Sequence, residues 1–271
     1  MSPHDLDTLF AAAAQGDEVE VPQGWGQGRA TFGGLVTGVM LARCVAAYGL
    51  DPDGLRAATT SFVAPVTPGP AKVTAEVLRQ GSSATQAEIR LTQRDERTGT
   101  ETVRAVVLAT FGADRVSSVV VPADGASAPP PAPDGLPALP HLPGVTPDFF
   151  AHVDMRLATG AFPFSGASGG DLTGFMRFRM PTATFTLAHF VALVDAWPPA
   201  PGQMLTRPVG MSSLTWTIEP VGHIPDAPEA FWWYEVVTDV AQDGYAHSHA
   251  RIFGPDGALV AISRQIITLF G

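Results

Sequence analysis

The chain carries one pattern of helix and strand signals twice, and this internal repeat limits its fold more than any other feature. In the first copy, a helix-like run that ends at Tyr48 precedes a strand with the ending Ala64-Pro65-Val66, and three more strand-like runs follow. Roughly 155 residues later the same order returns, with a helix-like run over 187–197, a strand with the ending Glu219-Pro220-Val221 and three more strands. We therefore expect two fused units of one design.

The two copies differ in polarity at matched places. The second copy has Asp195 on its helix and Gln265 on its last strand, whereas the first has the apolar Met40 and Val106 or a close neighbour. A polar group on an apolar face is costly to bury without a partner. Polar residues kept in only one copy therefore predict one functional site per chain, in the second unit.

Hydrophobic periodicity and turn residues predict the elements of each unit. In the first unit we expect a helix over 35–47 that stops at Gly49, and strands over 18–21, 57–63, 72–78, 85–92 and 102–111. In the second we expect a helix over 187–197 and strands over 149–157, 172–180, 211–218, 231–240, 245–253 and 259–269. One helix followed by four antiparallel strands, twice, predicts an α+β fold in which a curved sheet wraps each helix and the two sheets lie side by side.

A proline-rich segment from Pro122 to Pro147 separates the two copies, and nine of its 26 residues are proline. Proline cannot donate to a helix or a strand ladder, so this segment is expected to be a linker or an extended crossover. The predicted organisation is an N-terminal unit over 1–118, a linker over 119–147 and a C-terminal unit over 148–271.

Charge and cysteine content exclude several classes of protein. The formal net charge of -10, with 16 Lys plus Arg against 26 Asp plus Glu, argues against a general nucleic-acid binder. The apolar stretches are strand-sized and do not approach the ~20 residues of a membrane-spanning helix. The single Cys44 excludes an internal disulfide, and the start over Met1–Asp5 lacks the pattern of a signal peptide. We therefore expect a cytoplasmic protein.

Three segments carry a resemblance to a known family. They are Phe32-Gly33-Gly34 before the first helix, Leu193-Val194-Asp195-Ala196 on the second, and the C-terminal run over 256–265. With these residues, nearly the whole chain outside the linker resembles the double hotdog acyl-CoA thioesterases, the thioesterase II or TesB-like family. The resemblance implies a double hotdog fold and hydrolysis of an acyl-CoA thioester to a free acid and coenzyme A.

The resemblance also implies a site made of an Asp on the second helix, a Ser or Thr on the next strand and a Gln on the last strand. Asp195 and Gln265 match the first and third of these residues. Ser212 is the nearest match for the second, with Ser213 and Thr215 as alternatives in register, and Ser213 is also a candidate for substrate binding. The family usually has an acidic residue in this strand motif, and the present chain departs from that pattern over 211–216.

Asp195 shares one helix face with Ala188 and Val191, and this face should pack inward. A carboxylate there is suited to act as a general base or to orient an attacking water. The alternative, a capping or salt-bridging acid, is weakened because the helix dipole disfavours an acid near the C-terminal end. For Gln265, whose amide can donate to and accept from one water, the alternative is the solvent face of an alternating strand.

Gly33 and Gly34 precede a helix whose free N–H groups could polarise a thioester carbonyl, and glycine would let the acyl group approach closely. The alternative for this pair is a turn or tight packing between helix and sheet.

Other candidates favour structural roles. His189 lies on a different side of its helix from Asp195, and His247 and His249 alternate on one strand without an evident third metal ligand. Cys44 is interpreted as a core residue. The aromatic run over 231–234 could line an acyl pocket, although strand packing is the more usual role.

The sequence therefore predicts an acyl-CoA thioesterase that needs no metal and no cofactor beyond the coenzyme A of its substrate. The alternatives are a non-catalytic acyl-CoA binding protein of the same fold and, more weakly, a dehydratase or hydratase. The expected partners are an acyl-CoA and a second copy of the chain in a homodimer or larger homo-oligomer, with no nucleic acid and no membrane.

Overall fold

A computed structural model of the chain describes residues 6–128 and 130–270. Residues 1–5, on which the expectation about a signal peptide rests, lie outside the described residues. No helix of the described part is long and apolar enough to cross a membrane.

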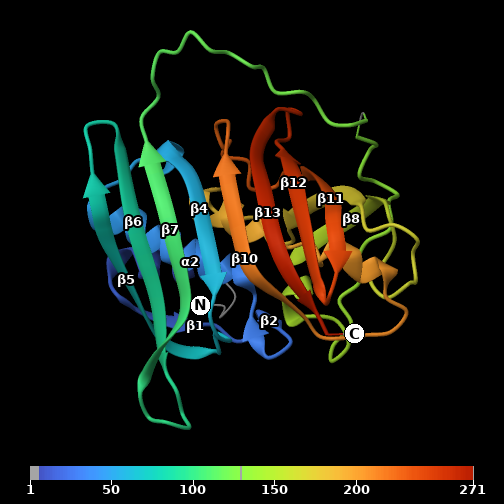
Figure 1. Cartoon of the computed structure of the whole chain (residues 1–271), viewed down its shortest axis with the longest axis horizontal. Coiled ribbons are helices and arrows are strands. Elements are labelled where there is room, and N and C mark those ends of the chain that lie inside the picture. The colour runs from blue at the N-terminus through green and yellow to red at the C-terminus, as the bar shows by residue number, and fades with distance from the viewer. Residues whose placement is uncertain (1–5, 129, 271) are drawn as a thin grey trace.

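Strands from both units join one antiparallel sheet (Figure 1). The first unit contributes β1 (Glu18–Val21), β4 (Leu55–Phe62), β5 (Gly69–Gln80), β6 (Ala84–Arg94) and β7 (Glu101–Gly112). The second contributes β8 (Val153–Thr159), β9 (Leu172–Phe178), β10 (Met211–Pro220), β11 (Trp232–Gln242), β12 (Tyr245–Phe253) and β13 (Leu259–Leu269). The order across the sheet is β1-β5-β6-β7-β4-β10-β13-β12-β11-β9-β8.

The two units meet where β4 pairs with β10, with Thr60 opposite Trp216. This pairing makes the two half-sheets continuous, so the prediction that they lie side by side is confirmed. It also gives each unit's inner strand a partner and leaves no free sheet edge at the junction.

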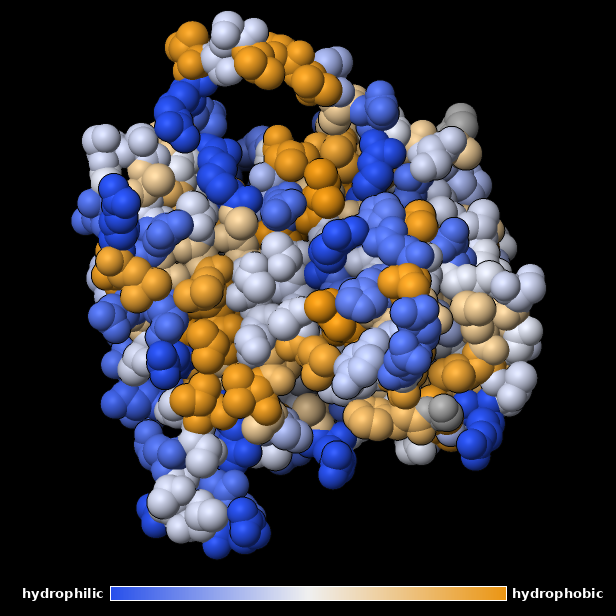
Figure 2. All heavy atoms as spheres, in the orientation of Figure 1, coloured by the Kyte–Doolittle hydropathy of each residue, from blue (hydrophilic) through white to orange (hydrophobic). Residues whose placement is uncertain are grey.

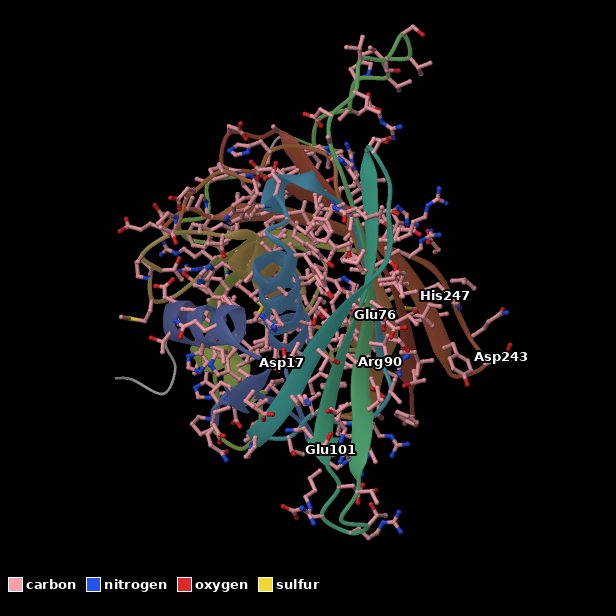
Figure 3. All side chains as sticks on the ribbon, turned by 90° about the vertical axis from the view of Figure 1, so that its left-hand side faces the viewer. Asp17, Glu76, Arg90, Glu101, Asp243 and His247 are labelled. Carbon is pink, nitrogen blue, oxygen red and sulfur yellow. The ribbon has the colours of Figure 1, made fainter. Side chains whose placement is uncertain are left out.

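Within residues 6–128 and 130–270, three α-helices lie on one side of the sheet, which curves around them (Figure 3). They are α1 (Leu6–Gln15), α2 (Gly33–Tyr48) and α3 (Leu187–Val194). The helix α2 ends at Gly49, which has φ of 57° and adopts the left-handed conformation that favours glycine. The sequence analysis predicted this stop, but it missed α1.

Glycine allows α2 and α3 to pack closely. A Cβ at Gly34 would lie 2.6 Å from the carbonyl oxygen of Ala192, and one at Gly38 would lie 2.7 Å from that of Ala188. Any larger residue at either position would push the two helices apart. The core between helices and sheet is apolar and includes the fully buried Met40.

The other predicted strands of the large sheet match the observed ones to within three residues at each end, whereas the short β2 (Gly26–Gln27) and β3 (Ala30–Thr31) were not predicted. The first strand and the helix of the second unit differ more. The expected strand over 149–157 begins with a 3-10 helix, η2 (Asp148–Ala151), before β8 starts at Val153. The predicted helix over 187–197 ends at Val194 instead, so Asp195 lies at its C-cap and not within it.

The segment between β7 and η2 arches over one end of the sheet to reach the second unit (Figure 1). Ser127 anchors it there: its backbone N–H and hydroxyl donate to the two carboxylate oxygens of Glu235, at 2.8 and 2.9 Å. The segment is thus an extended crossover held to the outer face of β11.

The face of the sheet away from the helices carries apolar side chains among polar ones (Figure 2). Leu108, Leu214 and Ile262 are exposed in this way. Scattered exposed apolar residues are ordinary on a protein surface, so the expected homo-oligomer stays a prediction.

Candidate functional site

Asp195 lies where the end of α3 meets the beginning of α2. It is the C-cap residue of α3, and its carboxylate accepts a hydrogen bond from the backbone N–H of Gly34 in the first turn of α2. The positive end of the α2 dipole therefore faces this carboxylate. The two units each supply one side of the contact.

Gln265 joins Asp195 to a hydroxyl group. Its Nε2 donates to Asp195 Oδ1 at 3.3 Å and to Ser213 Oγ at 2.7 Å. Both amide hydrogens are thus committed, which fixes the orientation of the Gln265 side chain. The structure brings together one carboxylate, one amide and one hydroxyl from α3, β13 and β10.

The hydroxyl in this cluster belongs to Ser213, whereas Ser212 was the first choice from the sequence. Ser212 is exposed, and its Oγ donates only to the neighbouring carbonyl oxygen of Ser213, at 3.5 Å. Thr215 precedes the buried Trp216 and so lies on the opposite face of β10. Of the three hydroxyls considered, Ser213 is the one at Gln265.

A β-bulge in β10 explains this choice. The pairing with β13 shifts between Ser213 and Thr215, and Leu214 is the extra residue. Strict alternation backwards from the inward-facing Trp216 would place Leu214 and Ser212 inside. The bulge reverses the phase and turns Ser213 toward the site.

Gly33 and Gly34 touch the carboxylate directly. A Cβ at Gly33 would lie 2.9 Å from Asp195 Oδ2 and 2.8 Å from the ring of Phe62, and one at Gly34 would lie 2.9 Å from the Cβ of Asp195. Only glycine leaves space here. The N–H of Gly34 is committed to Asp195, while the first N–H groups of a helix such as that of Gly33 have no acceptor within the helix.

Burial raises the pKa of Asp195 to about 7, and the hydrogen bonds from Gly34 and Gln265 oppose this effect. The carboxyl group therefore changes its protonation near neutral pH. A carboxylate with such a pKa can take a proton from water far more readily than an ordinary aspartate could.

A small cavity of about 10 Å³ lies behind Asp195 and Gln265. Its lining includes the aromatic residues Trp197, Trp216 and Tyr234 and the polar residues Ser248, His249 and Ser263. Of these residues, only Tyr234 belongs to the aromatic run over 231–234 that the sequence offered as a pocket lining. Alternation along β11 could have separated the aromatic run over 231–234, because Trp232 and Tyr234 belong to the main core while Phe231 and Trp233 belong to a second cluster on the other face.

Of the histidines considered from the sequence, His189 and His247 lie away from the Asp195 cluster, whereas His249 contributes to the lining of the small cavity. His189 is buried at the other end of α3, where its Nδ1 contacts Thr186 Oγ1 at 2.8 Å in a capping box and its Nε2 lies 3.1 Å from Asp7 Oδ1. His247 points to the outer face (Figure 3). His249 pairs with Asp239 at 2.8 Å.

Cys44 is fully buried, as the sequence analysis expected. Burial raises the pKa of its thiol to about 11, so the reactive thiolate is disfavoured.

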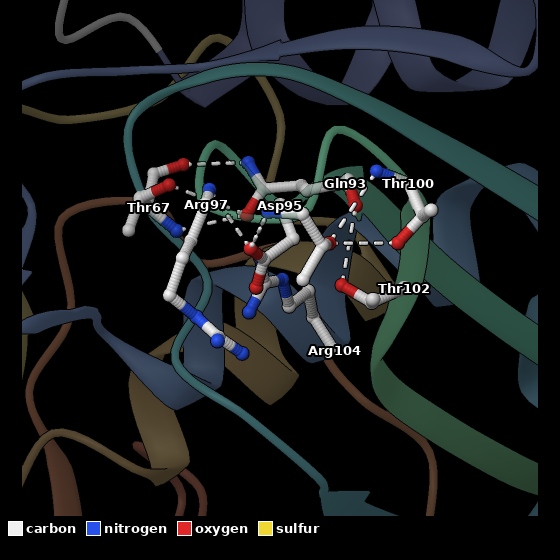
Figure 4. Close-up of polar contacts among 8 residues, drawn as sticks. Thr67, Gln93, Asp95, Arg97, Thr100, Thr102 and Arg104 are labelled. Atoms are coloured by element: carbon white, nitrogen blue, oxygen red, sulfur yellow. Dashed lines mark hydrogen bonds and ion pairs between the residues drawn. The ribbon is translucent and has the colours of Figure 1, made fainter.

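A second polar cluster, at the end of β6 and β7 in the first unit, has a structural role (Figure 4). Gln93 Oε1 accepts from the N–H of Thr67 at 2.9 Å, and Nε2 donates to the carbonyl oxygen of Thr67 at 2.7 Å. Asp95 accepts from the N–H groups of Arg97 and Thr98 in the turn. These bonds satisfy backbone groups of a loop and a turn.

Profiles of known families match both units of the chain. A profile of the acyl-CoA thioesterase N-terminal domain matches residues 21–112, and a profile of the acyl-CoA thioesterase C-terminal domain matches residues 124–269. The chain belongs to the acyl-CoA thioesterase family. This thioesterase is a thioester hydrolase with the double hotdog fold that the sequence predicted.

Solved structures share the fold of this thioesterase along almost its whole length. A hotdog-fold protein of unknown function from Alicyclobacillus acidocaldarius has a TM-score of 0.79 at 21% identity and covers 97% of this chain and 98% of its own. The acyl-CoA thioesterase II TesB2 from Mycobacterium marinum has a TM-score of 0.68 at 22% identity, covering 88% and 89%. No curated protein matches the sequence.

Proposed function

We propose that this thioesterase hydrolyses acyl-CoA by direct attack of a water molecule that Asp195 activates. The observation that carries the proposal is the hydrogen-bonded cluster of Asp195, Gln265 and Ser213 at the N-terminus of α2. Because the pKa of Asp195 lies at about 7, its carboxylate is basic enough to accept a proton from water at neutral pH.

Each residue has one task in the proposed reaction. Asp195 accepts a proton from the water as the water oxygen bonds to the thioester carbonyl carbon. Ser213 Oγ accepts one bond from Gln265 and keeps a second lone pair for the other hydrogen of the water. Gln265 holds both partners in place. The N–H of Gly33 is the donor available to the carbonyl oxygen as negative charge develops on it.

Collapse of the tetrahedral intermediate breaks the C–S bond and releases the acid. The proton held by Asp195 passes to the departing sulfur, which leaves as the thiol of coenzyme A. The scheme needs no covalent intermediate, and the enzyme returns to its starting state with Asp195 ionised.

Thiol release tests this proposal. Acyl-CoA substrates from acetyl to lauroyl are assayed with the wild type and with Asp195→Asn, which keeps the shape of the side chain and removes the base. We expect kcat/KM to fall by about 10²–10⁴-fold. The matched control is Asp243→Asn in an exposed turn, which should keep full activity.

Full activity in Asp195→Asn would refute the role of the carboxylate. The alternative, a non-catalytic acyl-CoA binding protein, would show tight binding of the same substrates to the wild type without any thiol release.

A further inference from the structure

The inner face of the sheet next to Gln265 carries two buried serines. Ser248 on β12 lies opposite Gln265, and Ser263 lies two residues before Gln265 on β13, so all three side chains are on the same face. The exposed fractions of Ser248 and Ser263 are 4% and 5%. A hydroxyl group at such a place is costly to bury unless it has a hydrogen-bond partner.

The first unit is apolar at the corresponding positions. Val107 of β7 is in register with Gln265 across the β4–β10 junction. Ile89 of β6 lies opposite Val107, just as Ser248 lies opposite Gln265, and both Ile89 and Val107 are fully buried. Ser248 is therefore a polar residue at a place where the first unit has core packing, as are Asp195 and Gln265.

Ser248 and Ser263 line the cavity of about 10 Å³ behind Asp195, together with Asp195 itself and Gln265. This volume is about the space that one water molecule needs. A cavity of this size that offers several polar groups holds a water molecule, whereas an apolar cavity stays dry.

The cavity is distinct from the place of the attacking water in the proposed reaction. β13 lies between β10 and β12 in the sheet, so Ser213 and Ser248 are on opposite sides of Gln265. The described lining of the cavity includes neither Ser213 nor Gly33. Asp195 and Gln265 belong to both places and therefore lie between them.

The cavity wall offers a water molecule both donors and acceptors. Trp216 Nε1 donates to Ser263 Oγ at 2.8 Å, so the Ser263 hydroxyl can donate its own proton elsewhere. Ser248 Oγ has no hydrogen-bond partner among the residues that the structure describes, and its proton is available too. The Asp195 carboxylate and Gln265 Oε1 are acceptors. Two donors and two acceptors match the hydrogen bonds that one buried water makes.

We propose that this cavity binds one water molecule and that Ser248 acts through this water as a positioning residue for the Asp195 carboxylate. The water accepts from the two serines and donates to Asp195 and to Gln265 Oε1. A donor to a carboxylate favours its ionised form, so the water keeps Asp195 ready to take a proton. This catalytic consequence rests on the proposed function, whereas the binding of the water does not.

The other groups around Asp195 do not obscure this effect. Burial and the charge of Asp195 raise the pKa of Tyr234 on β11, so Tyr234 stays neutral near pH 7. His249 on β12 pairs with Asp239 at 2.8 Å, and Arg264 donates to the same carboxylate at 2.9 Å. The residues that α2, β4 and β10 place near Asp195 are uncharged, namely Gly33, Gly34, Phe62, Ser213 and Trp216.

The first test is the pKa of Asp195 itself, measured by ¹³C NMR titration of protein labelled in its aspartate carboxyl groups. The signal of Asp195 is the one that Asp195→Asn removes. Ser248→Val replaces the hydroxyl by methyl groups that take the space of the water, and we expect the pKa to rise by about one unit because a hydrogen bond to a charged group is lost. If Ser248→Val does not fold, Ser248→Ala replaces it and should shift the pKa in the same direction. An unchanged pKa in the folded variant would overturn the positioning role.

The second test is the pH profile of kcat/KM for thiol release from acetyl- and butyryl-CoA. In Ser248→Val the inflection should move up by about one pH unit, so that kcat/KM falls about tenfold at pH 6 and stays within about twofold at pH 9. Ile89→Val changes the packing at the matched position of the first unit and should leave the inflection unchanged. A uniform loss in Ser248→Val without a shift would mean that Ser248 only packs, and the proposal would fail.

A crystal structure of the wild type tests the water directly. We expect one water within hydrogen-bond distance of Ser248 Oγ and of the Asp195 carboxylate, and none at this place in Ser248→Val. A wild-type cavity without density for a water would overturn the proposal. Failure of the proposed function is a separate result, in which Asp195→Asn keeps full thiol release although the pKa of Asp195 rises in Ser248→Val as expected.

Discussion

The two units present matched rows of inward-facing residues on either side of the β4–β10 junction, and only the second row meets a carboxylate at its helix. In register across the sheet lie Val107, Thr60, Trp216 and Gln265. Val107 is fully buried, whereas Gln265 reaches Asp195 and Ser213. Val107, next to Val106, therefore occupies the position in the first unit that corresponds to Gln265 in the second.

The helix positions differ in the same way. Met40 of α2 is fully buried in apolar surroundings, and its counterpart Asp195 is partly buried with its carboxylate at a helix N-terminus. The nearby Thr37 and Thr60 hydrogen-bond to one another at 3.1 Å and are fully buried. In the first unit, the residues at this position therefore pack in the core. In the second unit, the corresponding residues form the candidate site.

The largest expected difference between the rows is catalytic. Gln265→Leu removes the amide that holds Asp195 and Ser213, and we expect kcat/KM for thiol release to fall by about 10²–10³-fold. Val107→Ala in the mirrored position should keep kcat/KM within about twofold while it lowers the free energy of unfolding by about 2 kcal/mol. An equal loss of activity in both variants would show that the rows do not differ in function.

The next effect is the dependence of activity on pH. Because the proposed base is the ionised Asp195 with a pKa of about 7, kcat/KM should rise about tenfold per pH unit below 7 and level off above it. Between pH 5 and 8 the rise should be about 100-fold. Ser213→Ala should show the same profile at a lower level. A profile that is flat from pH 5 to 8 would exclude Asp195 as the base.

A smaller effect separates the two serines of β10. Ser213→Ala removes a hydroxyl that accepts from Gln265, and a neutral hydrogen bond of about 1 kcal/mol corresponds to a loss of roughly tenfold or less in kcat/KM. Ser212→Ala changes an exposed side chain and should leave kcat/KM within about twofold. If Ser212→Ala lowered kcat/KM more than Ser213→Ala, Ser212 would be the hydroxyl of the site, and the strand phase that we assign to the bulge of β10 would be wrong.

The contrast between Ser212 and Ser213 shows where the sequence was informative and where it was not. Periodicity and turn residues located the strands over 245–253 and 259–269 with the observed bounds, because alternation is a local property. The insertion of the single residue Leu214 is also a local feature, but it exchanges the inward-facing and outward-facing positions in the part of β10 that precedes it. The resemblance put Ser212 first, with Ser213 and Thr215 as alternatives in register, and no residue type over 211–216 announces the bulge that decides between them.

Contacts between the units could be predicted only in part. The repeat indicated that Asp195 and Gln265 belong to one site, but the length of α3 was overestimated by three residues, from Val194 to Trp197. In a longer helix the ring of Pro198 would clash with the carbonyl group of Val194, and Asp195 at the C-cap instead accepts a hydrogen bond from Gly34 of the other unit. The proline pair predicted a stop, but the hydrogen bond to Gly34 joins distant parts of the chain and could not be predicted from local sequence.

The smallest effect concerns the free energy of unfolding. It distinguishes Asp195 from a buried carboxylate that forms ion pairs. Its pKa is about 7 in the folded protein and near 3.9 in an unfolded chain. The folded protein therefore holds an extra proton between these values, and this contribution to stability, complete below about pH 4, is lost as the pH rises through 7. The full loss is at most about 4 kcal/mol.

Asp195→Asn should therefore raise Tm by several degrees at pH 8 and by much less at pH 5, as measured by thermal unfolding at both values. Asp154→Asn is the contrasting control, because Asp154 is buried and pairs with Arg156 at 2.7 Å and Arg177 at 3.6 Å. Breaking such a pair should lower Tm. A lower Tm for Asp195→Asn at pH 8 would mean that the carboxylate stabilises the fold. The site would then not lower the free energy of unfolding relative to the apolar row around Met40.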